Sequence, residues 1–164
     1  MTNGRFRGLA GVTMLAIFTP SFAAQPAAPG GRSEQLVAEA IAKTQRLNPA
    51  LNAVIAIDPS AIPAARSADR MAPRGPLHGQ PVLIKDNIES AGPLPTTAGS
   101  LALADNVTSR DAPLVARLRA SGAIILGKAN LSEWANIRSS SSISGWSAVG
   151  GQTRNPYALD RNTC

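Results

Sequence analysis

Lys85 is the residue whose surroundings in the sequence most favour chemistry. It follows four residues of buried type, 81–84, within LHGQPVLIKDNI (residues 77–88), a pattern that predicts a short strand giving way to loop at Lys85. Binding and catalytic groups gather at strand ends in α/β folds. A lysine moved out of water loses hydration, its pKa falls, and the neutral amine can accept a proton. The pattern therefore indicates a candidate general base.

The residues before this strand predict two helices with a strand between them. Ser33 is a candidate N-cap, and apolar residues then recur at helical spacing until Asn48-Pro49 ends the helix. Residues 51–57 predict a strand. Residues 61–71 predict a second helix with Pro63 near its first turn.

The residues after Lys85 predict a loop, a helix and a buried strand. The helix is expected from Asp111, with Pro113 in its first turn and Gly122 as its left-handed C-terminal stop, and residues 123–126 predict the strand. Alternating strands and helices of these lengths predict an α/β fold, a layered mixed sheet with flanking helices. Asn130 is expected to cap one more short helix.

The N-terminus resembles a secretory signal peptide over residues 1–23. Arg5 and Arg7 precede an apolar stretch at 9–18, and Ser21-Phe22-Ala23 offers small residues where a signal peptidase cuts. The stretch is too short to span a bilayer stably, so no membrane span is expected after cleavage; a retained anchor is the alternative. Residues 24–32 predict a flexible linker, and the protein is expected to be exported, periplasmic or secreted.

Composition argues against several classes of protein. The sixteen basic residues outnumber the ten acidic ones, for a net charge of +6, but they form no continuous run, so nucleic-acid binding is not expected. The single cysteine, Cys164, and the single histidine, His78, provide neither an internal disulfide nor a metal cluster.

Four segments in order resemble the N-terminal part of the amidase signature family. They are GPLHGQPVLIKDNI at 75–88, TTAGSLAL at 96–103, DAPLVARLRASGAIILGKANLSEWAN at 111–136 and GWSAVGGQTRNPYALDRNTC at 145–164. The resemblance implies the N-terminal portion of that family's fold over residues 33–164. It also implies hydrolysis of carboxamide C–N bonds in small-molecule or peptide amides by a Ser-cisSer-Lys triad, without metal or organic cofactor.

Lys85 matches the lysine of the family's triad. Asp86 and Asn87 follow it as in the family pattern, where they either orient the site or form the turn. The resemblance places both triad serines in a Gly- and Ser-rich region that follows a segment like residues 154–164, so no serine of this chain takes either role. The chain is therefore expected to be an incomplete domain that is inactive alone; the alternative is a non-catalytic exported remnant or binding module produced by truncation.

The remaining polar candidates have structural alternatives. Trp134, Ser139, Ser140 and Ser141 are possible walls of a substrate pocket beside Lys85, although packing for the tryptophan and local backbone bonding for the serines are favoured. His78 is expected to be structural. Lys128 is expected to be a solvated residue after a strand.

Overall fold

The computed structural model describes residues 30–137 and 139–163. The predicted signal peptide, most of the predicted linker and Cys164 lie outside the described residues. The helices and strands are α1 (Arg32–Leu51), β1 (Val54–Ile57), α2 (Ala61–Asp69), β2 (Pro81–Lys85), α3 (Pro113–Ala120), β3 (Ile124–Ala129), β4 (Trp146–Ser147) and β5 (Gly151–Gln152), with short 3-10 turns η1 (Leu101–Leu103) and η2 (Glu133–Asn136).

The main sheet has three strands in the order β1-β3-β2. The central strand β3 pairs antiparallel with β1 and parallel with β2. Helix α3 makes the crossover that lets β2 and β3 run parallel. It begins at Pro113, slightly later than the expected start at Asp111, and ends before Gly122 as predicted. The predicted mixed α/β fold is confirmed.

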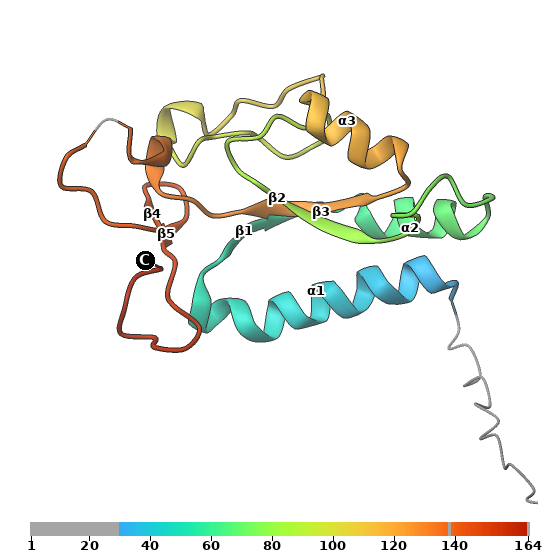
Figure 1. Ribbon diagram of the computed structural model, residues 1–164, viewed down its shortest axis with the longest axis horizontal. Helices are drawn as coiled ribbons and strands as arrows, with labels where there is room; N and C mark the ends of the chain where they lie inside the picture. Colours follow the sequence, from blue (N-terminus) through green and yellow to red (C-terminus); the bar gives the residue numbers. More distant parts are fainter. Residues whose placement is uncertain (1–29, 138, 164) are drawn as a thin grey trace, which may run out of the picture.

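Helices cover both faces of this sheet (Figure 1). On one face, α1 and α2 pack on the sheet through a core of buried residues: Val37, Ala61, Ala65, Ala68, Ile124 and Leu126. On the other face, α3 packs Val115 against Ile84 and Ile125. β3 supplies side chains to both cores, because successive residues of a strand point to opposite faces.

Helix α1 begins and ends differently from the prediction. Its N-cap is Gly31, and the backbone N–H groups of Ser33 and Glu34 donate to the Asp69 carboxylate at 2.8 and 3.0 Å. Ser33 is not the cap, because a carboxylate from the end of α2 takes that role. The helix also continues through Pro49 to Leu51 and does not end at Asn48-Pro49 as predicted. A proline in the last turn removes one backbone hydrogen bond, and the helix tolerates this loss.

A bulge in β3 decides where Lys128 points. Val82 pairs with Ile125 but Leu83 pairs with Gly127, so Leu126 has no partner in this register. A Cβ on Gly127 would lie 2.1 Å from the Ala56 carbonyl oxygen of β1, so glycine is required there. The extra residue reverses the alternation and places Lys128 beside Ile84, on the face that α3 covers.

The predicted short helix after Asn130 is wrong. Trp134, Ala135 and Asn136 have left-handed φ values of 49°, 53° and 63°, so this segment is a strained turn. Asn130 instead binds the hairpin of β4 and β5, donating to the Gly151 carbonyl at 3.0 Å and to the Thr153 hydroxyl at 2.9 Å. The competing long-range bonds of its amide explain why it caps no helix.

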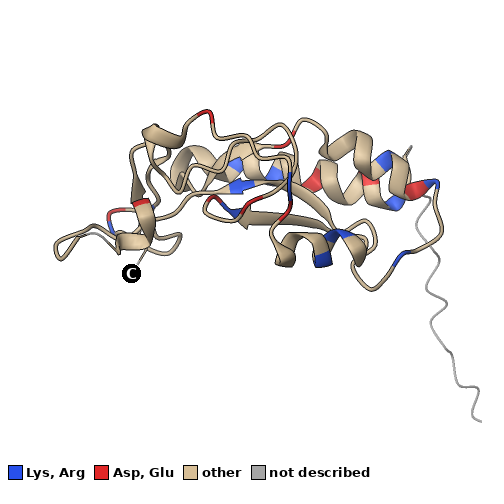
Figure 2. Cartoon of the chain, turned by 90° about the horizontal axis from the view of Figure 1, so that it is seen from above, with Lys and Arg blue, Asp and Glu red and all other residues tan. Residues whose placement is uncertain are grey.

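Charged residues are distributed over the whole described part of the chain, and Figure 2 shows basic and acidic positions interspersed on helices and loops. Among the described residues, none of the helices combines the length and apolar character needed to cross a bilayer.

Candidate functional site

Lys85 ends β2 and its side chain is exposed. Within the described residues its ammonium forms no hydrogen bond or ion pair, and Asn87, two residues on, is exposed as well. Lys85 pairs in register with Ala129, the last residue of β3, so the two parallel strands end together. The expected position at a strand end is confirmed, whereas the burial that would make the amine a base is not provided by the described residues.

Asp86 is the buried member of the segment after Lys85, with 1% of its surface exposed. Its carboxylate accepts hydrogen bonds from the hydroxyl and the backbone N–H of Thr97. Its backbone N–H donates to the Ala129 carbonyl at 3.0 Å, and its carbonyl accepts from Ala98 at 3.0 Å. Asp86 therefore joins the end of β2 both to β3 and to the loop at 96–99.

Lys128 is the ionisable residue that the sequence interpretation misplaced. It is 1% exposed, and its ammonium donates to the Ile88 carbonyl at 2.7 Å and to the Thr96 hydroxyl at 2.8 Å. Burial lowers the pKa of Lys128, and the negative charges of Asp86 and Glu89 offset part of that effect. The expectation of a solvated lysine is wrong because the bulge at Gly127 turns the side chain toward the loop after β2, where Ile88 and Thr96 bind its ammonium.

A chain of backbone hydrogen bonds connects the end of β2 to the turn at Trp134. The Ala98 N–H donates to Asp86, and the Ala98 carbonyl accepts from the Trp134 N–H at 2.9 Å. Ala98 itself has a left-handed φ of 51°. Each left-handed residue with a side chain costs about 1–2 kcal/mol, so surrounding contacts must hold these conformations.

The turn at Trp134 forms one wall of a cavity of about 470 Å³. Trp134 and Trp146 line it with 41% and 46% of their surfaces exposed, together with Ile143. The expectation that Trp134 is used mainly for buried packing is therefore wrong. The cavity presents two indole rings and an isoleucine to solvent, which favours an apolar or aromatic ligand.

The serines of the loop take different positions. Ser139 and Ser142 line the cavity, whereas Ser140 and Ser141 are exposed and are not among its lining residues. The Ser139 hydroxyl accepts a hydrogen bond from the Ser141 backbone N–H at 3.2 Å. That bond is of the local kind expected for a polar connection.

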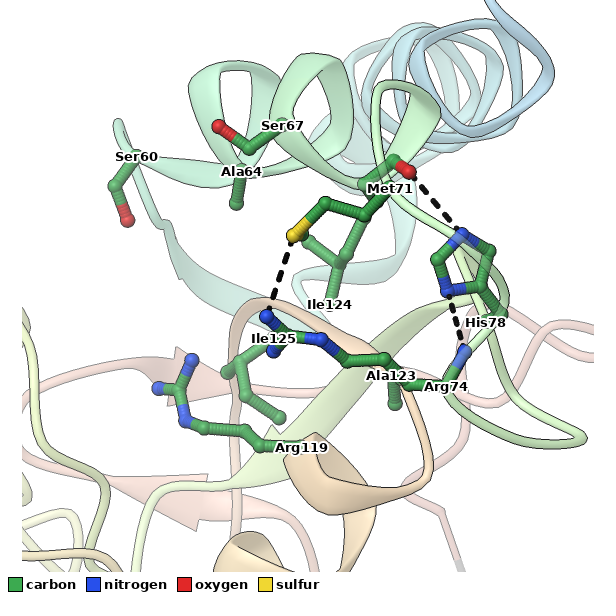
Figure 3. A pocket seen from close by; sticks show the side chains of 12 residues that line it. Ser60, Ala64, Ser67, Met71, Arg74, His78, Arg119, Ala123, Ile124 and Ile125 are labelled. Atoms are coloured by element: carbon green, nitrogen blue, oxygen red, sulfur yellow. Dashed lines mark hydrogen bonds between the residues drawn. The ribbon is translucent and has the colours of Figure 1, made fainter.

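His78 lies in a separate cavity of about 240 Å³ between α2 and α3 (Figure 3). One ring nitrogen accepts from the Arg74 backbone N–H at 3.3 Å, which leaves the other to donate to the Ala68 carbonyl at 3.2 Å. Both nitrogens are thus engaged with the backbone, and His78 is structural here. Among the described residues, His, Cys, Asp and Glu form no cluster of three that could hold a metal.

Comparison with known proteins identifies a family over most of the chain. The family model described as Amidase matches residues 35–164. A "probable amidase" of Arabidopsis thaliana is 52% identical over 136 residues, which make up 79% of this chain and 27% of that protein.

Two solved structures show the same fold. The peptide amidase from Stenotrophomonas maltophilia is 51% identical with a TM-score of 0.74, over 77% of this chain and 27% of that one. An amidase family protein from Bacillus anthracis is 38% identical with a TM-score of 0.75, over 80% of this chain and 28% of that one. The chain therefore spans little more than a quarter of the length of these relatives.

Proposed function

Because the chain belongs to the amidase family, we propose that it contributes Lys85 to a Ser-cisSer-Lys triad that hydrolyses carboxamide C–N bonds. The placement of Lys85 supports this role, because it lies at a strand end that the buried Asp86 holds through Ala129 and Thr97. Asp86 is the orienting residue in this proposal. Asn87 is exposed and contributes to the turn.

The chemistry assigns the lysine amine one task. It accepts the proton that the nucleophilic serine loses through the bridging serine, while the serine oxygen bonds to the amide carbon. The C–N bond then breaks, ammonia or an amine leaves with a proton, and water hydrolyses the acyl-enzyme. No serine of these 164 residues is assigned to the relay, so the chain alone is expected to show no turnover.

We further propose amides with an apolar or aromatic group, peptide amides in particular, as the substrate class. The exposed indoles of Trp134 and Trp146 support this choice, since they offer flat apolar walls in one cavity. Backbone hydrogen bonds through Ala98 connect Trp134 to Asp86. The similarity to a peptide amidase at 51% identity supports it as well.

A chimera tests the function directly. Residues 35–164 replace the matching N-terminal segment of the Stenotrophomonas maltophilia peptide amidase, and hydrolysis of a peptide amide is measured by release of ammonia. The chimera is expected to be active, and Lys85→Met is expected to lower kcat about 100- to 10,000-fold. Lys43→Met, an exposed lysine of α1, is the matched control and should leave kcat unchanged.

Two results would contradict this assignment. An active chimera that tolerates Lys85→Met would show that Lys85 is not the base. Turnover by the 164-residue chain alone, abolished by Lys85→Ala, would show that the serines are within it. An inactive but folded chimera would favour the alternative, a non-catalytic remnant or binding module, which the exposure of Lys85 also favours.

We propose export as the fate of the chain, on the basis of Arg5, Arg7 and the apolar stretch at 9–18. Expression in a bacterium should yield a mature chain that starts at Ala24 in the periplasm or medium. Mass spectrometry of the fractions checks this, and an uncleaved N-terminus in the cytoplasm would contradict it.

A further inference from the structure

Lys128 is a buried cation that the proposed reaction does not use. Its ammonium bonds two neutral acceptors, the Ile88 carbonyl at 2.7 Å and the Thr96 hydroxyl at 2.8 Å. Asp86 and Glu89 are the carboxylates whose charge acts on it, although neither forms a direct ion pair with it in the described part of the chain. Glu89 is paired instead with Arg110, at 2.9 Å.

The two acceptors lie at opposite ends of one loop. Ile88 follows directly after the turn that ends β2, and Thr96 comes eight residues later, where the chain returns. Asn106 also holds Thr96. The Thr96 N–H donates to the Asn106 carbonyl at 2.9 Å, and the Asn106 side-chain amide donates to the Thr96 carbonyl at 2.8 Å. The ammonium therefore closes the loop at its base.

The segment after Thr96 carries this constraint to the cavity. Thr97 bonds the Asp86 carboxylate, Ala98 donates to the Asp86 carbonyl and the Ala98 carbonyl accepts from Trp134. Gly99 packs closely beneath the turn, since a Cβ there would lie 3.2 Å from the Glu133 Cα. A shift of Thr96 would thus move the left-handed residues that carry the Trp134 ring.

We propose that Lys128 is a positioning residue: by tying Ile88 to Thr96, its ammonium sets the Trp134 wall of the cavity relative to the end of β2. Its relevance to amide hydrolysis rests on the proposed function, because only then is Lys85, at the end of β2, the base. The mechanical link from Lys128 to Trp134 is independent of it. Among the described residues, Lys128 forms no hydrogen bond with Lys85 or with a residue that lines the cavity at Trp134.

Amide hydrogen exchange on the 164-residue chain tests the link, read by NMR without any substrate. Lys128→Met keeps an unbranched apolar stem and removes the ammonium. In this variant the N–H groups of Ala98 and Trp134 are expected to exchange about tenfold faster or more, relative to a reference amide. The reference is the Asp58 N–H, which donates to the Leu126 carbonyl at 2.8 Å near the opposite face of the sheet.

Two further variants separate positioning from general loss of stability. Val37→Ala removes a fully buried side chain from the α1 side and should not accelerate Ala98 and Trp134 relative to Asp58. Thr96→Val removes only the hydroxyl that Lys128 holds and should reproduce the pattern of Lys128→Met; it decides the question if Lys128→Met does not fold. Unchanged protection of Ala98 and Trp134 in either folded variant overturns the proposal. Because no activity is measured, failure of the amidase assignment would leave this result unaffected.

Discussion

Lys85 and Lys128 lie on adjacent parallel strands, one residue apart in register, and point to opposite faces of the sheet. Lys128 pairs with Ile84 and lies on the face of the sheet that α3 covers. Lys85 is the next residue of β2 and is exposed. Two lysines of similar sequence context thus have different chemical environments. Lys85 is exposed, whereas the ammonium of the buried Lys128 is bonded to Ile88 and Thr96.

The cavity assignment predicts a change in specificity on loss of Trp146. In the chimera, Trp146→Ala should raise KM for a peptide amide with an aromatic C-terminal residue about tenfold relative to glycinamide, since an indole contact contributes about 1.4 kcal/mol or more. Steady-state kinetics on both amides measure this. Ser140→Ala is the matched control, because Ser140 is exposed in the same loop but does not line the cavity. Equal KM changes for both amides would exclude this wall from recognition.

The burial of Lys128 predicts a pH dependence of stability. Its pKa in the folded chain lies below the ordinary 10.5, so between these two values the unfolded state binds more protons. The contribution of Lys128 to stability therefore rises with pH and levels off above 10.5.

Urea unfolding of the native chain and Lys128→Met, at pH values up to 10.5, measures this contribution. The difference in unfolding free energy should grow in favour of the native chain as pH rises. Lys43→Met is carried through the same series as the matched control. A difference that stays constant or shrinks would mean that Lys128 is hydrated in solution.

The long-range cap of α1 predicts a loss of stability for Asp69→Asn. Burial acts to raise the pKa of Asp69, but the N–H groups of Ser33 and Glu34 outweigh it and hold the pKa below 3.8. The stabilisation is present above 3.8 and is lost as pH falls through the lowered value. The variant should lose about 0.5–2 kcal/mol at neutral pH in urea unfolding.

The control for this cap is Asp105→Asn, an exposed carboxylate with no side-chain hydrogen bond or ion pair in the described residues. It should change the unfolding free energy by less than about 0.5 kcal/mol. Equal effects of the two variants would indicate that net charge, rather than the cap, is responsible.

The contacts of Asn130 predict local detachment of the β4–β5 hairpin. Its amide donates to Gly151 and Thr153, and its carbonyl oxygen accepts from the Ser147 hydroxyl at 2.7 Å. Asn130→Ala should lower the free energy of unfolding by about 1–3 kcal/mol. The amides of the hairpin should lose exchange protection under conditions in which those of the main sheet keep it. Asn162→Ala, an exposed amide near the end of the described residues, is the control. Unchanged hairpin protection would show that the backbone alone holds it.

The sequence by itself determined the features that depend on neighbouring residues. The apolar run 81–84 predicted β2 and its end at Lys85, and Pro113 and Gly122 predicted the first turn and the end of α3. Such features follow from local hydrophobic spacing and from the backbone preferences of proline and glycine. The family resemblance extended this to the fold as a whole, which the similarity to solved amidases confirms.

Tertiary structure alone decided which lysine is buried and where the tryptophans lie. Lys128 is buried because the bulge at Gly127, where the backbone closely approaches Ala56 about seventy residues away in the sequence, turns the next side chain over. Trp134 faces a cavity because its left-handed turn is held through Ala98 by the end of β2. Neither contact leaves a periodic signal in the sequence, since each joins segments that are distant along the chain and close only after folding.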